Sequence, residues 1–177
     1  SISTAYLSFV QPADIASLTS VQVQGFSTAQ LRLLDATQVG SIAQAAVPGI
    51  TPTQIASLST SFIDRLSVAA FRGLTTAQLR NFDTTQVRAI ATEDFNALSA
   101  VQVGAFSTVQ VAAISTTQLV ALSTANIKGF SASQFGVIAS ADLGVIELSD
   151  FAALTSVPLG GLTTSQIAGV DSNQIAV

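Results

Sequence analysis

Acidic side chains that could bind a cation or form an acid–base pair recur at regular spacing in the second half of the sequence. Asp94, Asp142 and Asp150 occupy equivalent places in a repeating pattern, and Glu93 directly precedes the first of them. Neighbouring carboxylates can share a proton or coordinate a divalent cation. A calcium loop needs closely spaced oxygens of the type Asp-x-Asp-x-Asp-Gly, which this sequence lacks. The alternative is that each acid substitutes in the capping box of a helix, where its charge favours the helix dipole.

Four arginines form a second candidate site. Arg72, Arg80 and Arg88 recur every eight residues, and Arg65 lies nearby. On a regular repeat they could form a basic stripe that binds a glycan, an acidic cell surface or another copy of the chain. The alternative is an ordinary solvated face. Four positive charges are too few for nucleic acid, and the net charge of −4 gives no basic field, so we expect no nucleic-acid partner.

The residue types on which most enzymes and metal sites depend are absent. The chain has 177 residues and contains no Cys, His, Met or Trp. Disulfides, thiolate or imidazole metal sites and every nucleophile–histidine pair are therefore excluded. Apolar residues make up 49% and charged residues only 9%, against about 25% charged in a typical soluble domain. We expect a protein that is not an enzyme and binds no cofactor, and this composition favours an extracellular or cell-surface location.

Both candidate sites are embedded in an eight-residue repeat. From Ser3 onward the sequence divides into 22 octads, the last one residue short, with the consensus Ser/Thr-Ser/Thr-x-Gln-Val/Ile/Leu-x-Ala/Gly-Leu/Ile/Phe. Position five is a large apolar residue in all 22 octads, and position four is Gln in 12 of them. No insertion breaks the register, so we predict a single solenoid over residues 1–177. A fainter 48-residue repeat groups the octads into 35–82, 83–130 and 131–177.

A very short capped helix in each octad fits this consensus best. One continuous helix fails, because its apolar positions would rotate by about 80° per octad. Ser, Thr or Asp at position one is a preferred N-cap, and Gln at position four completes a capping box. A helix of about five residues is not stable alone, so neighbouring octads must stack around a continuous apolar interior. The sequence predicts an all-α solenoid, and of the possible two, three or six octads per turn we favour three, which gives a triangular coil.

Glycine, proline and phenylalanine refine this expectation. Pro12 and Pro52 fall at the first helical position, where they are tolerated, whereas Pro48 and Pro158 should distort their octads. Almost every Phe falls at an apolar position, and the exceptions Phe9 and Phe62 are candidate exposed contacts. Glycines at position seven predict left-handed helix stops. These glycines are Gly25, Gly49, Gly73, Gly129, Gly161 and Gly169.

A long uncharged stretch could be mistaken for a membrane span. Residues 95–127 contain no charged side chain, which is long enough to cross a bilayer. Gln102, Gln110 and Gln118 interrupt it at eight-residue intervals, as expected for the octad and not for a lipid-facing helix. We therefore predict no insertion into a membrane.

The octads resemble the Ser-Thr-x-Gln-Ile-x-Ala-Leu repeats of large bacterial secreted or surface proteins that are described as adhesin-like or haem-utilisation proteins. The octad from Ser115 to Leu122, which reads STTQLVAL, shows this style closely. The resemblance extends from Ser3 to Val177 and implies an extracellular repeat array. It does not imply haem binding here, because His, Met and Cys are absent and Tyr6 is the only tyrosine.

Both ends of the array remain in the repeat pattern. Ile2 and Leu7 begin it, and Ile175 and Val177 end it, so these four residues are candidates for end-to-end contact. A head-to-tail contact between copies can propagate as a filament. The sequence therefore predicts a structural protein that assembles with itself into a fibre, sheath or matrix. The alternative is a stalk or ligand-binding segment of a bacterial surface adhesin, cut from a longer array.

Overall fold

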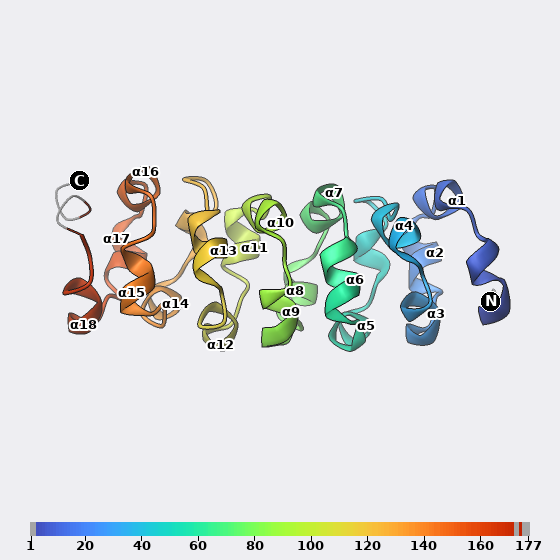
Figure 1. Ribbon diagram of the computed structural model, residues 1–177, viewed down its shortest axis with the longest axis horizontal. Coiled ribbons are helices and arrows are strands. Elements are labelled where there is room, and N and C mark those ends of the chain that lie inside the picture. The colour runs from blue at the N-terminus through green and yellow to red at the C-terminus, as the bar shows by residue number, and fades with distance from the viewer. Residues whose placement is uncertain (1–2, 172–173, 175–177) are drawn as a thin grey trace. The chain divides into compact units, whose positions relative to one another are not determined.

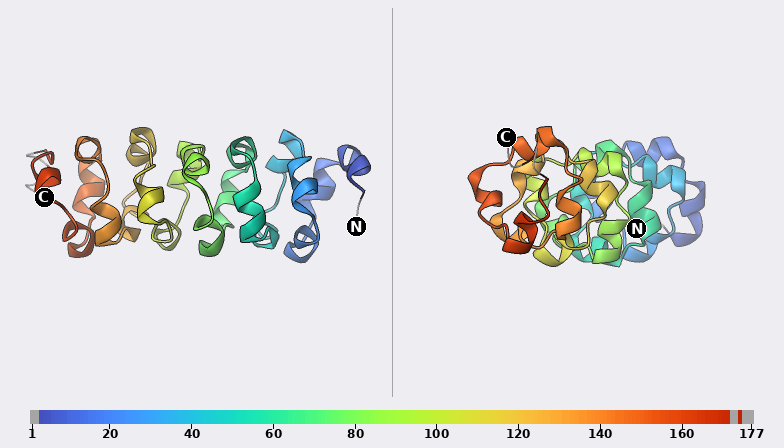
Figure 2. Two further views of the ribbon diagram at one scale, coloured as in Figure 1. Left: turned by 90° about the horizontal axis from the view of Figure 1, so that it is seen from below. Right: turned by 60° about the vertical axis from the view of Figure 1, so that its left-hand side comes forward.

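The computed structural model describes residues 3–171 and residue 174, and this part of the chain is helical without any strand. It divides into two compact units, Ser1–Ile90 and Ala91–Val177, and the division falls between two octads. Each unit consists of short helices that follow one another around a coil (Figure 1), and Figure 2 shows the same units from two other directions. The fold class is the predicted one, an all-α solenoid.

Each of the first 21 octads contains one helix, either an α-helix or a short 3-10 helix (η). The helices of the first unit are η1 (Thr4–Phe9), α1 (Pro12–Ala16), α2 (Ser20–Gln24), α3 (Thr28–Arg32), α4 (Ala36–Gly40), η2 (Val47–Gly49), α5 (Pro52–Ser57), α6 (Thr60–Arg65), α7 (Val68–Arg72), α8 (Thr76–Leu79) and α9 (Thr84–Arg88). The helices of the second unit are α10 (Thr92–Asn96), α11 (Ala100–Val103), α12 (Thr108–Val111), α13 (Thr116–Val120), η3 (Ile127–Gly129), α14 (Ala132–Phe135), α15 (Ser140–Leu143), α16 (Leu148–Ala152), α17 (Ser156–Leu159) and α18 (Thr164–Ile167).

The capping box predicted from positions one and four is present. In α8, the Thr75 backbone N–H donates to Gln78 Oε1 at 2.7 Å, and Gln78 N–H donates to Thr75 Oγ1 at 3.2 Å. Ser99 and Gln102 form the same reciprocal pair at α11. Because a helix leaves its first four N–H groups without intrahelical acceptors, this local chemistry starts the helices whose octads carry the box.

The four prolines lie at different places relative to the helices of their octads. Pro12 and Pro52 open α1 and α5, as predicted. Pro48 lies in η2, where its octad forms a turn and a 3-10 helix. The octad of η3 has the same structure without a proline, so this departure from an α-helix is not assigned to Pro48. The expectation for Pro158 is wrong, because this residue lies in the first turn of α17, where no intrahelical acceptor is lost. Since Pro158 has no N–H, however, the Thr155 side chain makes no capping hydrogen bond.

This difference between two caps gives a first prediction. Thr75→Ala should lower the free energy of unfolding by about 1 kcal/mol, because its hydroxyl accepts from Gln78 N–H. Thr155→Ala should change it by less than about 0.5 kcal/mol, because no N–H faces that hydroxyl. Urea unfolding followed by circular dichroism measures both values. Equal losses in the two variants would contradict the capping account.

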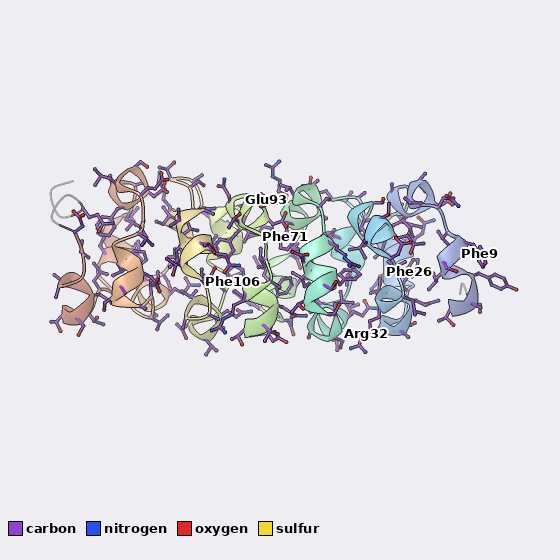
Figure 3. The ribbon with its side chains drawn as sticks, viewed as in Figure 1. Phe9, Phe26, Arg32, Phe71, Glu93 and Phe106 are labelled. Carbon is purple, nitrogen blue, oxygen red and sulfur yellow. The ribbon has the colours of Figure 1, made fainter. Side chains whose placement is uncertain are left out.

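The apolar interior of each unit is made from positions five and eight. Phe71 in the first unit and Phe135 in the second are completely buried (Figure 3 labels Phe71). In the second unit, the rings of Phe95 and Phe106 stack with their centroids 6.1 Å apart. Burying two large side chains per octad supplies the main stabilisation of helices that are too short to persist alone.

Successive turns stack at a spacing of three octads. In the first unit α1 contacts α4, α5 contacts α8 and α6 contacts α9. In the second unit α10 contacts α13, α14 contacts α17 and α15 contacts α18. The two helices of each pair begin 24 residues apart, as α1 at Pro12 and α4 at Ala36 do. The predicted triangular coil with three octads per turn is confirmed within each unit, and the 48-residue repeat would then equal two turns. That one array runs through both units stays a prediction.

The position-four glutamines also join one turn to the next. Gln78 Nε2 donates to the carbonyl oxygens of Val47 at 2.8 Å and Ile50 at 2.6 Å, 31 and 28 residues earlier. We call this pair of hydrogen bonds an amide rung. The same two spacings recur at Gln38, Gln86, Gln166 and Gln174. One buried amide therefore caps its own helix with Oε1 and holds the preceding turn with Nε2.

The glycines at position seven do not form left-handed stops, and that expectation is wrong. No glycine in the described ranges has a positive φ, and Gly25 ends α2 at φ −71°. Five of the six, all but Gly25, instead allow close backbone approach between turns. A Cβ added to Gly49 would lie 2.0 Å from Ser20 O, and one added to Gly129 would lie 2.0 Å from Ala100 O. Glycine is required at these positions because the neighbouring turn leaves no room for a Cβ, and not because of the backbone conformation.

Candidate functional site

The four arginines do not form the predicted stripe. All four side chains are exposed. Since a turn holds three octads, Arg72, Arg80 and Arg88 lie on three successive sides of the coil in the first unit. Only Arg65 and Arg88 share a side, because they belong to the contacting helices α6 and α9.

The two exceptional phenylalanines have opposite environments. Phe9 is 74% exposed at the end of η1, as expected, and Figure 3 labels it at that end of the first unit. Phe62 is only 5% exposed, so its prediction as an exposed contact is wrong. The reason is that position four faces the preceding turn, where octads of the consensus type bury a glutamine such as Gln78 or Gln86. Sequence reasoning treated this position as a cap alone and missed its second partner.

The acidic residues do not gather into a common site. Glu93 is exposed while Asp94 beside it is buried, so the two carboxylates lie on different faces of α10 (Figure 3 labels Glu93). Asp142 accepts a hydrogen bond from Thr116 Oγ1 at 2.7 Å. Asp94, Asp142 and Asp150 all lie in first helical turns, as the second interpretation requires, although their N-cap side chains make no capping hydrogen bond. Among the described residues, no three side chains of the metal-binding types lie close enough together to hold an ion.

Asp150 is a buried acid whose pKa is raised. Its side chain is 4% exposed, and burial followed by repulsion from Glu147 raises the pKa of this carboxyl above 3.8. In the consensus, position four is Gln, whose uncharged amide both accepts and donates hydrogen bonds. The Asp150 carboxylate can only accept them. The folded state consequently favours the protonated form of Asp150.

The pKa of Asp150 predicts a pH-dependent loss of stability. Because the folded pKa is raised, the stabilising contribution is present below about pH 3.8 and is lost as the pH rises through the folded value. Asp150→Asn should therefore be more stable than the wild type at pH 7 and equally stable at pH 3. Thermal unfolding across this range measures the difference. Glu147→Gln should remove a smaller part of it, and a pH-independent gap between Asp150→Asn and the wild type would contradict the assignment.

The last turns of the second unit contain an apolar pocket. It has a volume of about 310 Å³ and is lined by Phe151, Ala152, Leu154, Leu159, Leu162, Ile167, Val170 and Gln174. Ile167 occupies a core position of its octad but is 52% exposed. Positions that are buried by a following turn elsewhere in the unit are accessible here.

The first octads of the first unit show the complementary feature. Tyr6 and Phe9 of η1 are 66% and 74% exposed. Gln22 caps α2 through its Oε1 atom, but it is exposed and its Nε2 donates to no other described residue. Of the predicted end contacts, Leu7 is buried under the rung from Gln38, and Ile2, Ile175 and Val177 lie outside the described residues.

None of the helices in the described ranges reaches the length and hydropathy needed to cross a bilayer. The uncharged stretch at residues 95–127 is divided among separate helices from α10 to η3.

Comparison with known proteins identifies a repeat protein. A family model described as the ALTTAQ repeat matches two overlapping stretches, residues 87–124 and 111–145. Its six letters correspond to octad positions seven, eight, one, two, three and four, which read Ala-Ile-Ser-Thr-Thr-Gln at residues 113–118. No curated protein matches the chain. The matched family description names the repeat and does not state an activity.

Proposed function

We propose that this repeat protein is a non-enzymatic, extracellular structural protein whose copies assemble head to tail. The observation that carries the proposal is the complementarity between the accessible apolar pocket of the last turns and the unused rung donor of the first turns. Stacking continues the interaction by which each turn already binds the next within a unit. Such a heterologous contact can repeat without closing and so produces a filament.

The rung spacing defines a specific register for this contact. A second copy follows this spacing when its Gln22 stands 31 positions beyond Ile167 and 28 positions beyond Val170 of the first copy. These are the rung spacings that Gln78 uses within the first unit. In the same register Tyr6 stands 31 positions beyond Phe151, at the apolar pocket. A tyrosine that is exposed in the free chain would thereby be covered.

Electron microscopy and sedimentation velocity over a range of protein concentrations test this proposal. The wild type should form thin filaments of uniform width. Gln22→Glu should remain monomeric, because a carboxylate cannot donate to the Ile167 and Val170 carbonyls. Gln24→Glu makes the same charge change on the exposed side of the same helix and should still assemble. A wild type that stays monomeric at every concentration, or a Gln22→Glu variant that assembles normally, would refute the proposal.

A second candidate function is a stalk or binding segment of a surface adhesin. The same apolar pocket favours it, because further octads of a longer chain would cover Ile167 as the next turn covers the equivalent position elsewhere. Dispersed short rods in the electron micrographs, together with closure of this pocket when more octads are appended, would favour the stalk over the fibre.

A further inference from the structure

We propose that the first unit contains a binding pocket for a small oxyanion, formed by Arg32, Arg65, Ser59 and Ser61. The pocket has a volume of about 240 Å³ and lies where the end of α3, α4 and the start of α6 meet. Its other lining residues are Leu34, Val39 and Phe62. Two of the six basic residues of the chain line this one pocket. Because ligand pockets usually measure about 300–1,000 Å³, its size suits a single charged group, either a free ion or a group on a larger molecule.

Phe62 is the reason that polar groups remain available here. In other octads Gln at position four accepts the N-cap N–H with Oε1, as Gln54 does from Thr51 at 2.8 Å. Phe62 cannot accept, so α6 has no capping box and only Ser59 Oγ is used, by Phe62 N–H at 3.2 Å. The Ser59 backbone N–H has no acceptor within the described part of the chain. It is a donor at the place where octads with glutamine at position four supply an oxygen.

The arginines add positive charge and further donors to this place. Arg32 donates to the Ser57 carbonyl oxygen through Nε at 2.9 Å and through Nη2, which fixes the guanidinium between α3 and α5 (Figure 3). A guanidinium has five N–H donors, so others remain for a ligand. Arg65 makes no hydrogen bond or ion pair to another described residue. Two guanidinium groups, a hydroxyl and a backbone N–H are the donors that sulfate, phosphate or carboxylate groups bind.

An NMR titration of the isotope-labelled chain with sodium sulfate, at ionic strength held constant with sodium chloride, tests this site. The Ser59 amide resonance should shift and saturate. Arg65→Gln should raise the apparent dissociation constant at least tenfold, and Ser61→Ala should raise it by a smaller factor. Arg80→Gln, which removes an arginine outside the pocket, should bind as the wild type does. A linear shift without saturation, or equal binding by Arg65→Gln, would overturn the proposal.

Phe62→Gln tests the stated cause directly. The new amide should accept the Ser59 N–H and donate to the Leu34 carbonyl 28 residues earlier, as the consensus residue does, and so abolish the sulfate-induced shift. Full sulfate binding by a folded Phe62→Gln variant would overturn the proposal. A parallel titration with a sulfated disaccharide distinguishes the sources of the anion. At least tenfold tighter binding than inorganic sulfate assigns the site to a group on a carbohydrate, and equal binding assigns it to a free ion.

Discussion

Gln78→Glu should lower the free energy of unfolding by about 3–5 kcal/mol, the cost of leaving a buried charge without its partner. The substitution keeps the shape of the side chain and its acceptor for the Thr75 N–H. It removes both donors to Val47 O and Ile50 O, and it brings a carboxylate against those two carbonyl oxygens at a site that is 1% exposed. Whole domains are stable by only about 5–15 kcal/mol, so the effect on the first unit should be large. Urea unfolding at pH 7 measures it.

The first turn of the same unit offers a matched control. Gln22→Glu makes the same change at the same octad position, but Gln22 is exposed and its Nε2 donates to no other described residue. Its effect on the unfolding free energy of the monomer should be below about 0.5 kcal/mol. At acidic pH part of the loss in Gln78→Glu should be recovered, because a protonated carboxyl regains one donor. Similar losses in the two variants would show that the capping box, and not the rung, carries the stability.

Gly49→Ala should destabilise the first unit by about 3 kcal/mol, at the upper end of the cost of overpacking. The new Cβ would lie 2.0 Å from Ser20 O and 2.7 Å from Ser20 C, which are backbone atoms that cannot rotate away. The contact between η2 and α2 must therefore open. Thermal unfolding measures the loss, and faster hydrogen exchange at Ser20 and its neighbours would locate it.

Gly40→Ala is the corresponding control. A Cβ at Gly40 meets only Arg65 O, at the ordinary contact distance of 3.5 Å, and the residue is helical in α4. Alanine should stabilise this position by about 0.5–1 kcal/mol through its higher helix propensity. If Gly49→Ala were also neutral or stabilising, the close approach between η2 and α2 would not be a requirement of the fold.

Much of the local structure could be predicted because its causes lie within eight residues. The cap at Thr75 and its partner Gln78 are three residues apart, so their interaction depends on the sequence between them alone. The same holds for Pro52 at the start of α5. The candidate sites were predicted less well. The arginine stripe and the exposed Phe62 both required knowledge of which octads face each other. The pocket at Arg32 was not predicted, because the residues that line it come from octads far apart in the sequence.

By itself, then, the sequence determined that an octad forms one short helix with two apolar side chains directed inward, and that a side-chain cap starts this helix where the consensus residues are present. Cap chemistry and an eight-residue period specify this without reference to other turns. The tertiary structure decided that turns stack at 24 residues, as α5 does on α8. It thereby decided that Gln78 holds Ile50 and that Gly49 must lack a Cβ. The period is compatible with several numbers of octads per turn, and only packing of the apolar interior selects one of them.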